Sequence, residues 1–319
     1  MVTRTRLGSM RELLIDRASR IYSVVIPGLV LTILCEGTAL LISPASYKAQ
    51  ADSFSWAHVP LQIVANLTFT AQCWGYEINP LSNSPFWSMS FECVYYVLFA
   101  LLLYGWDSKV CRSIALLLAI AAGPAIVLLF PIWLLGCLLY DLYIWLDQKS
   151  YAFLLTTGLL AITLATCVLF RQSIIHMLLI TDMRHRTEWL QHFFSPALQS
   201  RLADRTGMVP WLSRASLSFY LAGVLTSIAL LWMLITIDRF FPKIPLGIAT
   251  RLRRVAEGTF VLYLFHLPLL ILVSSLLHGP PRFPIASATG IVVLCILAAS
   301  YIDRLKLSMR TWLRVIFPT

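Results

Sequence analysis

A single carboxylate, Glu92, stands inside the apolar segment formed by residues 84–104. Placing an ionisable side chain at membrane depth costs about 2.5–3.5 kcal/mol on insertion scales, so we interpret Glu92 as a functional-site residue. Ser88 precedes Glu92 by four residues and Tyr96 follows it by four. A helix places these side chains on one face, which predicts a hydroxyl, a carboxylate and a phenol side by side. The alternative is a structural role, in which a Ser or Tyr hydrogen bond to Glu92 joins helices.

Ser84 and Pro85 predict where this helix begins. Ser is a favoured N-cap residue, and Pro suits the first helical position because its missing N–H would be unpaired there in any case. With a rise of about 1.5 Å per residue, Glu92 lies roughly 12 Å from this start. Trp87 falls in the first turn, next to Ser88.

Arg17 and Arg20 form a second group, directly before an apolar run that begins at Ile21. Three residues apart on a helix, their guanidinium groups share a face. The planar guanidinium fork matches phosphate oxygens, so the pair suits a nucleotide-bearing donor such as coenzyme A. The alternative is a pair of cytoplasmic anchors whose charged ends snorkel to the lipid headgroups.

His266 is the third candidate, in an otherwise apolar segment that also contains Pro268. Because Pro268 has no N–H, the carbonyl of Leu264 loses its helical partner. A neutral imidazole could bond such a backbone defect or a neighbouring helix, and it could also transfer protons near neutral pH. We favour the structural role for His266.

The composition places these groups in a membrane protein. Hydrophobic residues make up 59% of the 319 residues and charged residues 13%, against about 25% charged residues in a typical soluble domain. Several windows of about 20 residues are almost free of charge, which is enough to cross a hydrocarbon core of about 30 Å. The net charge of +10 does not indicate nucleic-acid binding, because the basic residues flank apolar segments, as the positive-inside rule predicts.

The apolar segments predict an all-α polytopic transmembrane helical bundle, with about eight spans and one re-entrant segment. Residues 59–74 are only moderately apolar and contain Gln62, Asn66 and Gln72, so we expect them to enter the membrane without a simple crossing. The expected spans are residues 21–43, 84–104, 113–130, 132–146, 152–170, 216–237, 259–277 and 284–302.

Charge bias predicts the orientation of this bundle. A basic linker (residues 1–20) precedes the transmembrane domain (residues 21–303), and a basic tail (residues 304–319) follows it. The linker, the tail and the stretch 243–254 are the most basic short flanks, so we expect them in the cytoplasm. The connections expected on the outside are residues 44–58, 75–84, 171–214 and 278–283.

The cysteines and histidines do not form a metal-binding pattern. The seven cysteines include no Cys-x-x-Cys pair and lie mostly in apolar segments, where free thiols behave as small hydrophobes. His185 and His192 are seven residues apart, without the i, i+4 spacing of a helical zinc site. We therefore predict neither a disulfide framework, nor a metal site, nor a bound cofactor.

Three segments, in this order, resemble elements of the acyltransferase 3 family of membrane enzymes. Arg17-Ala-Ser-Arg20 resembles the family's Arg-x-x-Arg element ahead of a span. Residues 85–96 are similar to its Pro-x-Trp-Ser-Leu-x-x-Glu-x-x-Phe-Tyr motif, with Met and Tyr in place of the motif's Leu and Phe. Residues 263–268 resemble its late Tyr-Leu-x-His-x-Pro run. The similarity extends over nearly the whole chain.

The resemblance implies a multi-pass protein of the bacterial cytoplasmic (inner) membrane. It would move an acyl group, most commonly acetyl, from acyl-CoA to a hydroxyl of a cell-surface glycan or of a lipid-linked saccharide. Arg17 and Arg20 would hold phosphates of the donor, and Glu92 would be the catalytic residue that organises the site or assists proton movement. The other substrate-binding residues would be Trp87, Ser88, Tyr96 and His266.

The family's first two spans, which carry an Arg and a later His taken as the catalytic base, have no counterpart in the sequence. None of the six histidines stands in that context. We therefore expect the transmembrane domain to be N-terminally truncated: a fragment, a misassigned start or a non-catalytic relative. Two in-frame apolar spans upstream of Met1 in the genomic DNA would identify a misassigned start.

Two other classes of function stay open. A transporter or flippase for a lipid-linked sugar would use Glu36, Glu92 and His266 as polar points along a path. Transporters of this kind often consist of two related halves with broken spans, and the sequence shows no such internal repeat. The other class is a membrane protein without catalytic or transport activity.

Overall fold

The computed structural model describes residues 8–44, 47, 56–147, 149, 151–169, 217–240, 245–277 and 284–318. The long connection predicted at residues 171–214 lies outside these ranges. The described residues form helices and turns without a strand. The longer helices are α2 (Met10–Ile42), α4 (Val59–Leu67), α5 (Trp87–Tyr104), α6 (Lys109–Ala122), α7 (Pro124–Asp147), α8 (Ala152–Leu169), α13 (Leu217–Phe240), α14 (Leu246–Leu276) and α15 (Pro284–Ile316).

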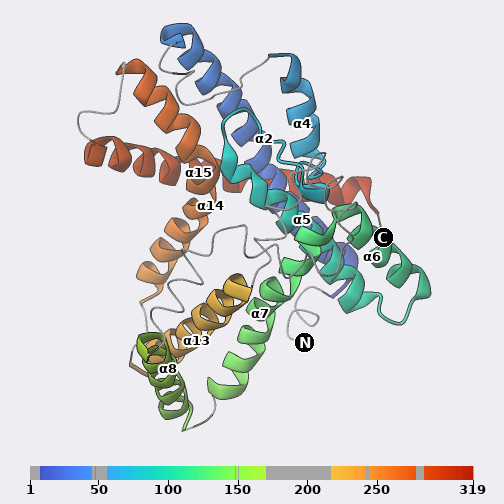
Figure 1. Cartoon of the computed structure of the whole chain (residues 1–319), viewed down its shortest axis with the longest axis vertical. Helices are drawn as coiled ribbons and strands as arrows, with labels where there is room; N and C mark the ends of the chain where they lie inside the picture. The colour runs from blue at the N-terminus through green and yellow to red at the C-terminus, as the bar shows by residue number, and fades with distance from the viewer. Residues whose placement is uncertain are drawn as a thin grey trace. The chain divides into compact units, whose positions relative to one another are not determined.

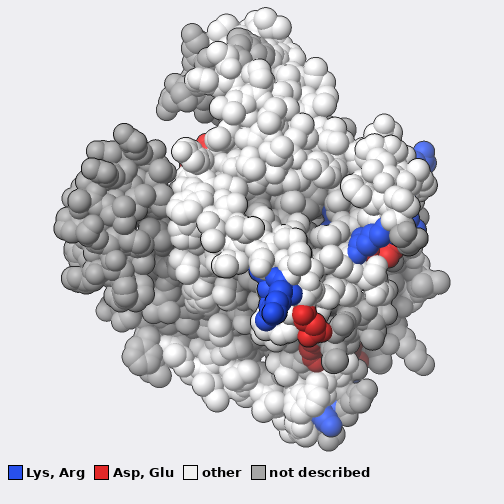
Figure 2. Space-filling model, turned by 90° about the vertical axis from the view of Figure 1, so that its right-hand side faces the viewer, with Lys and Arg blue, Asp and Glu red and all other residues white. Residues whose placement is uncertain are grey.

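The helices confirm a polytopic membrane bundle. Six helical segments in the described ranges are long and apolar enough to cross a membrane: Met10–Ile42, Ser84–Tyr104, Pro124–Leu146, Ala222–Phe240, Gly258–Leu276 and Ile285–Ile316. On the face shown in Figure 2, charged side chains gather in a few spots and the remaining described surface is uncharged. Such a surface suits hydrocarbon better than water.

One predicted boundary is wrong. The sequence places spans at residues 113–130 and 132–146, with a break at Pro131, whereas α7 continues through Pro131. The break lies at Gly123, whose φ of +88° belongs to the left-handed region that favours glycine. Pro124 then begins α7, as suits a residue without an N–H. Helix α6 has 14 residues and is therefore about 21 Å long, short of the hydrocarbon core of about 30 Å.

The chain divides into two compact units. In the unit formed by residues 7–72, 77–116 and 245–319, α2, α14 and α15 pack against one another and α5 packs against α2 (Figure 1). In the other unit, α13 packs against both α7 and α8. The Trp232 indole on α13 donates to the Thr157 hydroxyl on α8 over 3.1 Å.

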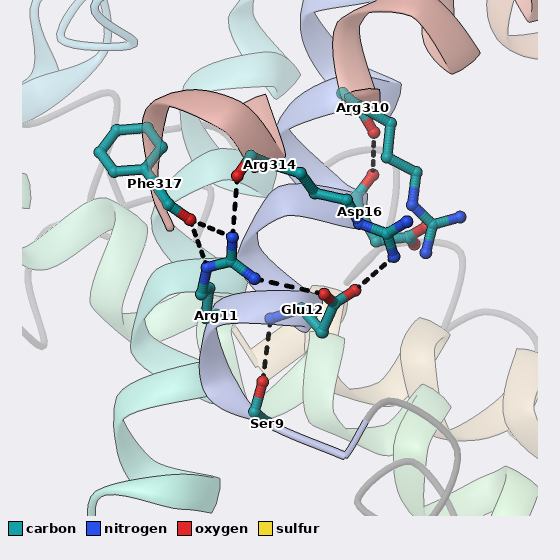
Figure 3. A network of polar contacts seen from close by, with 8 residues as sticks. Ser9, Arg11, Glu12, Asp16, Arg310, Arg314 and Phe317 are labelled. Carbon is teal, nitrogen blue, oxygen red and sulfur yellow. Dashed lines mark hydrogen bonds and ion pairs between the residues drawn. The ribbon is translucent and has the colours of Figure 1, made fainter. Parts of the chain in front are cut away.

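Helices α2 and α15 run antiparallel and meet at one end, as Figure 3 shows. Glu12 accepts a 2.7 Å hydrogen bond from Arg314, and Asp16 lies 3.5 Å from Arg310. Each helix has 33 residues and is therefore about 50 Å long, against a hydrocarbon core of about 30 Å. The charged contacts identify this end, which we call the basic end, as the part that extends past the hydrocarbon.

Helix α14 runs parallel to α2. The Arg20 guanidinium lies over the Phe260 ring at 5.8 Å, and Ile271 shares a buried cluster with Ala39. The start of α14 therefore lies at the basic end together with the start of α2 and the end of α15. The structure thus brings the described parts of the three basic flanks, residues 8–20, 245–254 and 304–318, to one end of this unit. The location of this end in the cytoplasm stays a prediction.

The segment before α5 enters the bundle without crossing it. Helix α4 has nine residues and is therefore about 14 Å long, too short for a span. At its end the Tyr22 hydroxyl donates to the Leu67 carbonyl over 3.0 Å, and the chain then returns, so that Asn66 donates to the Ile78 carbonyl over 2.7 Å. We call residues 59–83 the re-entrant segment, because this path has the hairpin form expected for residues 59–74.

Candidate functional site

The start of α5 differs from the prediction for Ser84. Residues Ser84–Phe86 form a 3-10 turn, and Asn83, with no side-chain cap bond, holds its N-cap position. The prediction that Ser84 caps the helix is therefore wrong, although Pro85 lies in the first turn as expected. The Asn83 side chain is fully buried and is used elsewhere: its amide donates to the Thr32 hydroxyl over 2.8 Å and to the Leu264 carbonyl over 3.0 Å.

The contact between Asn83 and Leu264 satisfies the backbone defect made by Pro268. Pro268 lies inside α14 and cannot donate to the Leu264 carbonyl. The Asn83 amide, 181 residues away in sequence, replaces the missing donor. His266 was expected to play such a part, but its Nδ1 is 2.9 Å from the carbonyl of Leu262, one turn earlier in the same helix.

Two contacts fix the height of α5 along α2. Phe86 is fully buried, and a Cβ atom added to Gly28 would lie 3.1 Å from its ring. Ten residues later, the Tyr96 ring lies 5.1 Å below the Arg17 guanidinium. The distance along the helix between the two contacts is about 15 Å on α5 and about 16 Å on α2. Because residue numbers increase from the first contact to the second on α5 and decrease on α2, the two helices run antiparallel. Glu92 consequently lies near the level of Tyr22, toward the basic end.

Glu92, Tyr96 and Arg17 form a continuous chain of contacts. The Tyr96 hydroxyl donates to the Glu92 carboxylate over 2.6 Å, which confirms the predicted shared face. The Arg17 guanidinium covers the Tyr96 ring in cation–π geometry. The Nε of Arg17 is buried and lacks a hydrogen bond to any described residue, although Asp16 lies 4.0 Å away. Glu92 and Arg17 are both half-buried.

Arg20 lies at the same level but faces a different helix. Its side chain is exposed and covers Phe260 of α14, whereas Arg17 faces α5. The two guanidinium groups therefore lie on either side of the first turns of the α2 span. Both keep N–H groups that a phosphate could accept from.

Ser88 and Trp87 occupy the turn before Glu92. The Ser88 hydroxyl donates to the Pro85 carbonyl over 3.3 Å, so the structure does not bring it into a bond with Glu92. Trp87 is half-buried and packs edge-on against Phe91 with 5.2 Å between the ring centres. Both residues support the start of α5, next to the turn that carries Glu92.

His266 lies at a cavity of about 420 Å³ between α14 and α15. The residues that line this cavity do not include Glu92, Arg17 or Arg20. His266 therefore does not share a cavity with the contact chain of Glu92, Tyr96 and Arg17. The cavity is lined by Thr259, Leu262, Tyr263, His266 and Leu270 of α14 and by Ala288, Ile291 and Val292 of α15.

A second carboxylate, Glu36, is fully buried, whereas the sequence offers it only as a polar point along a transport path. Only 1% of its surface is exposed. It accepts a 2.7 Å hydrogen bond from the Tyr47 hydroxyl and a 3.2 Å bond from the Ser82 N–H. Burial and the hydrogen bond to Glu36 raise the pKa of Tyr47 well above its ordinary value, so this phenol stays protonated and donates. Glu36 is an ionisable residue inside the apolar run 21–43, and the rule applied to Glu92 would also have identified it.

Comparison with protein-family models gives one match over most of the chain. A model described as an acyltransferase domain matches residues 1–304. No curated protein and no solved structure matches the chain.

Proposed function

Because the chain belongs to the acyltransferase 3 family, we propose that it transfers an acyl group, acetyl in the first instance, from acyl-CoA to a hydroxyl of a cell-surface glycan or a lipid-linked saccharide. We further propose that it works in the bacterial cytoplasmic membrane, with the basic end in the cytoplasm, where acyl-CoA is made. The contact chain of Glu92, Tyr96 and Arg17 is the observation that carries this proposal.

The donor would bind at the level of Arg17 and Arg20. Both guanidinium groups lie near the boundary between the α2 span and the charged contacts of the basic end. A water-soluble donor can reach this level without entering hydrocarbon. The terminal N–H groups of Arg17 and the exposed fork of Arg20 would supply the charge-assisted hydrogen bonds that phosphate oxygens accept.

Glu92 would act beside the thioester end of the donor. In the transfer, the acceptor oxygen forms a bond to the thioester carbonyl carbon, the carbon–sulfur bond breaks, and coenzyme A leaves as a thiolate that takes up a proton. The half-buried Glu92 carboxylate would accept the proton of the acceptor hydroxyl, directly or through an ordered group. Tyr96 would orient the carboxylate through its 2.6 Å hydrogen bond, and Trp87 and Ser88 would shape the adjoining pocket.

Radiolabelled acetyl-CoA supplied to membranes that contain the full chain tests this function. Label should appear in the glycan or lipid-linked saccharide fraction, and Glu92→Gln should lower it at least 100-fold, within the range of a positioned proton acceptor. Glu77→Gln, which changes an exposed carboxylate before α5, is the matched control and should leave the label unchanged. Movement of an unmodified saccharide across the membrane, without labelling, would contradict acyl transfer and favour transport.

A further inference from the structure

The cavity between α14 and α15 combines apolar walls with an imidazole in a defined hydrogen-bonding state. A backbone carbonyl can only accept a hydrogen bond, so the 2.9 Å contact with the Leu262 carbonyl places a hydrogen on Nδ1 of His266. In the neutral imidazole the other nitrogen, Nε2, is then an acceptor. Within the described residues, His266 makes no second hydrogen bond, so Nε2 is available to a ligand.

Tyr263 supplies the complementary donor. It precedes His266 by three residues, so the two side chains share a face of α14, and both line the cavity. Its hydroxyl is without a hydrogen-bond partner among the described residues. The Thr259 hydroxyl, by contrast, already donates to the Ala256 carbonyl over 2.6 Å. The remaining lining is Leu, Ile, Val and Ala.

The position of the cavity limits where its ligand comes from. Gly258–Leu276 and Ile285–Ile316 are both segments long and apolar enough to cross a membrane. His266 follows Phe265, which lies beside Gly28, so its level is nearer the middle of the α2 span than that of Arg17 is. A molecule with an apolar body can reach this level between two spans from the lipid phase.

We propose that this cavity binds a hydroxylated lipid, with its hydroxyl held between His266 and Tyr263. A hydroxyl donates to Nε2 and accepts from the phenol, so one group satisfies both side chains. The hydrocarbon chain would lie against Leu262, Leu270 and Ile291. The volume of about 420 Å³ falls within the range of about 300–1,000 Å³ that is usual for ligand pockets. Binding requires no acyl donor and therefore stands apart from the proposed acyl transfer.

Photo-crosslinking with a matched pair of lipids tests this site. The first probe is an octadecanoid chain with a hydroxyl halfway along it and a diazirine nearby, and the second is the same molecule with a methyl ether in place of the hydroxyl. The full chain is reconstituted in phosphatidylcholine vesicles without acyl-CoA, and labelled residues are mapped by mass spectrometry. The hydroxyl probe should label α14 and α15 around the cavity roughly 3- to 10-fold more than the ether, the effect of one net hydrogen bond.

Variants identify the groups responsible. Tyr263→Phe removes a donor that both the hydroxyl and the ether oxygen can accept from, so it should lower labelling by both probes. His266→Phe removes the acceptor that only the hydroxyl can use and should abolish the preference for the hydroxyl probe. Tyr301→Phe is the control, because Tyr301 is 68% exposed on α15 and does not line the cavity. Equal labelling by the two probes in the native chain would show a site for any lipid chain and overturn the proposal. Labelling confined to other helices would overturn it as well.

Discussion

At the scale of single residues, the site depends on three charged or polar groups that meet at one level of the bundle. Tyr96 donates to Glu92, and Arg17 covers the Tyr96 ring. The phenol thus connects a carboxylate to a guanidinium without a direct ion pair between them. In the proposed reaction, Arg17 would use its remaining donors to bind an anion, and Glu92 would face an alcohol.

Replacing Arg17 and Arg20 by Ala should weaken use of the donor. Each charge-assisted hydrogen bond to phosphate contributes about 1.5–3 kcal/mol, so each single variant should raise the KM for acetyl-CoA by roughly 10- to 150-fold and lower kcat less. Steady-state transfer of radiolabelled acetyl groups measures both constants. Arg310→Ala removes an equal charge from the ion pair with Asp16 and serves as control. An unchanged KM in the double variant would refute the phosphate role.

Tyr96→Phe tests the contribution of the Tyr96 hydroxyl apart from that of its ring. The variant keeps the surface under Arg17 but removes the donor to Glu92, so the rate at saturating acetyl-CoA should fall roughly tenfold or more. Tyr95→Phe removes a hydroxyl at the next position, from a ring that packs edge-on against Phe91, and should keep most of the rate. Initial rates, measured with the thermal unfolding midpoint, distinguish the two. Equal rates for both variants would mean that Tyr96 acts only through packing.

At the scale of elements, the re-entrant segment ties α5 to two other helices. Ser82 donates to Glu36 of α2, and Asn83 donates to Thr32 of α2 and to Leu264 of α14. Irregular backbone at membrane depth is tolerated only where protein satisfies its polar groups. These buried bonds meet that condition and hold the start of α5 in place.

A double-mutant cycle with Pro268 can test whether Asn83 stabilises the fold by pairing the Leu264 carbonyl. Asn83→Ala leaves a buried carbonyl unpaired and should lower the free energy of unfolding by about 1–3 kcal/mol. Pro268→Ala restores an N–H one turn after Leu264, so in that background Asn83→Ala should cost less. Chemical unfolding in detergent micelles gives the four free energies of this double-mutant cycle. Strictly additive costs would show that Asn83 stabilises the fold by another route.

Relations within one helix were predictable from the sequence. The four-residue spacing placed Tyr96 beside Glu92, and apolar runs located most spans. The break at Gly123 was missed because Pro124 and Pro131 can each begin a helix, and only Pro124 does so here. The partner of Leu264 could not be predicted, since helical periodicity carries no information about a residue 181 positions away.

At the scale of the whole molecule, the described parts of the three basic flanks gather at one end of one compact unit. Helices α2 and α15 both extend there beyond the length that hydrocarbon requires. Their contacts are solvent-accessible ion pairs, such as that between Arg314 and Glu12, and such pairs contribute little to stability. We therefore expect this gathering of positive charge to matter more for orientation in the membrane than for stability of the fold.

Labelling single cysteines from one side of the membrane tests this orientation. In a background without the native cysteines, Ser9→Cys and Phe317→Cys should both react with a membrane-impermeant maleimide in sealed inside-out vesicles, because both residues are exposed at the basic end. Pro44→Cys, beyond the other end of α2, should react only in right-side-out vesicles. Reaction of positions 9 and 317 from opposite sides would contradict the antiparallel contact of α2 and α15.

The depth in the bundle at which α5 begins determines which groups lie between its first turn and the far end of α2. Its first turn lies beside Gly28, and the space toward the far end of α2 contains the amides and carbonyls of residues 78–83, with Glu36 beside them. Polar groups there raise the local dielectric response relative to lipid tails. At this depth the chain thus places protein dipoles, held by hydrogen bonds such as that from Ser82 to Glu36, where lipid tails would otherwise lie.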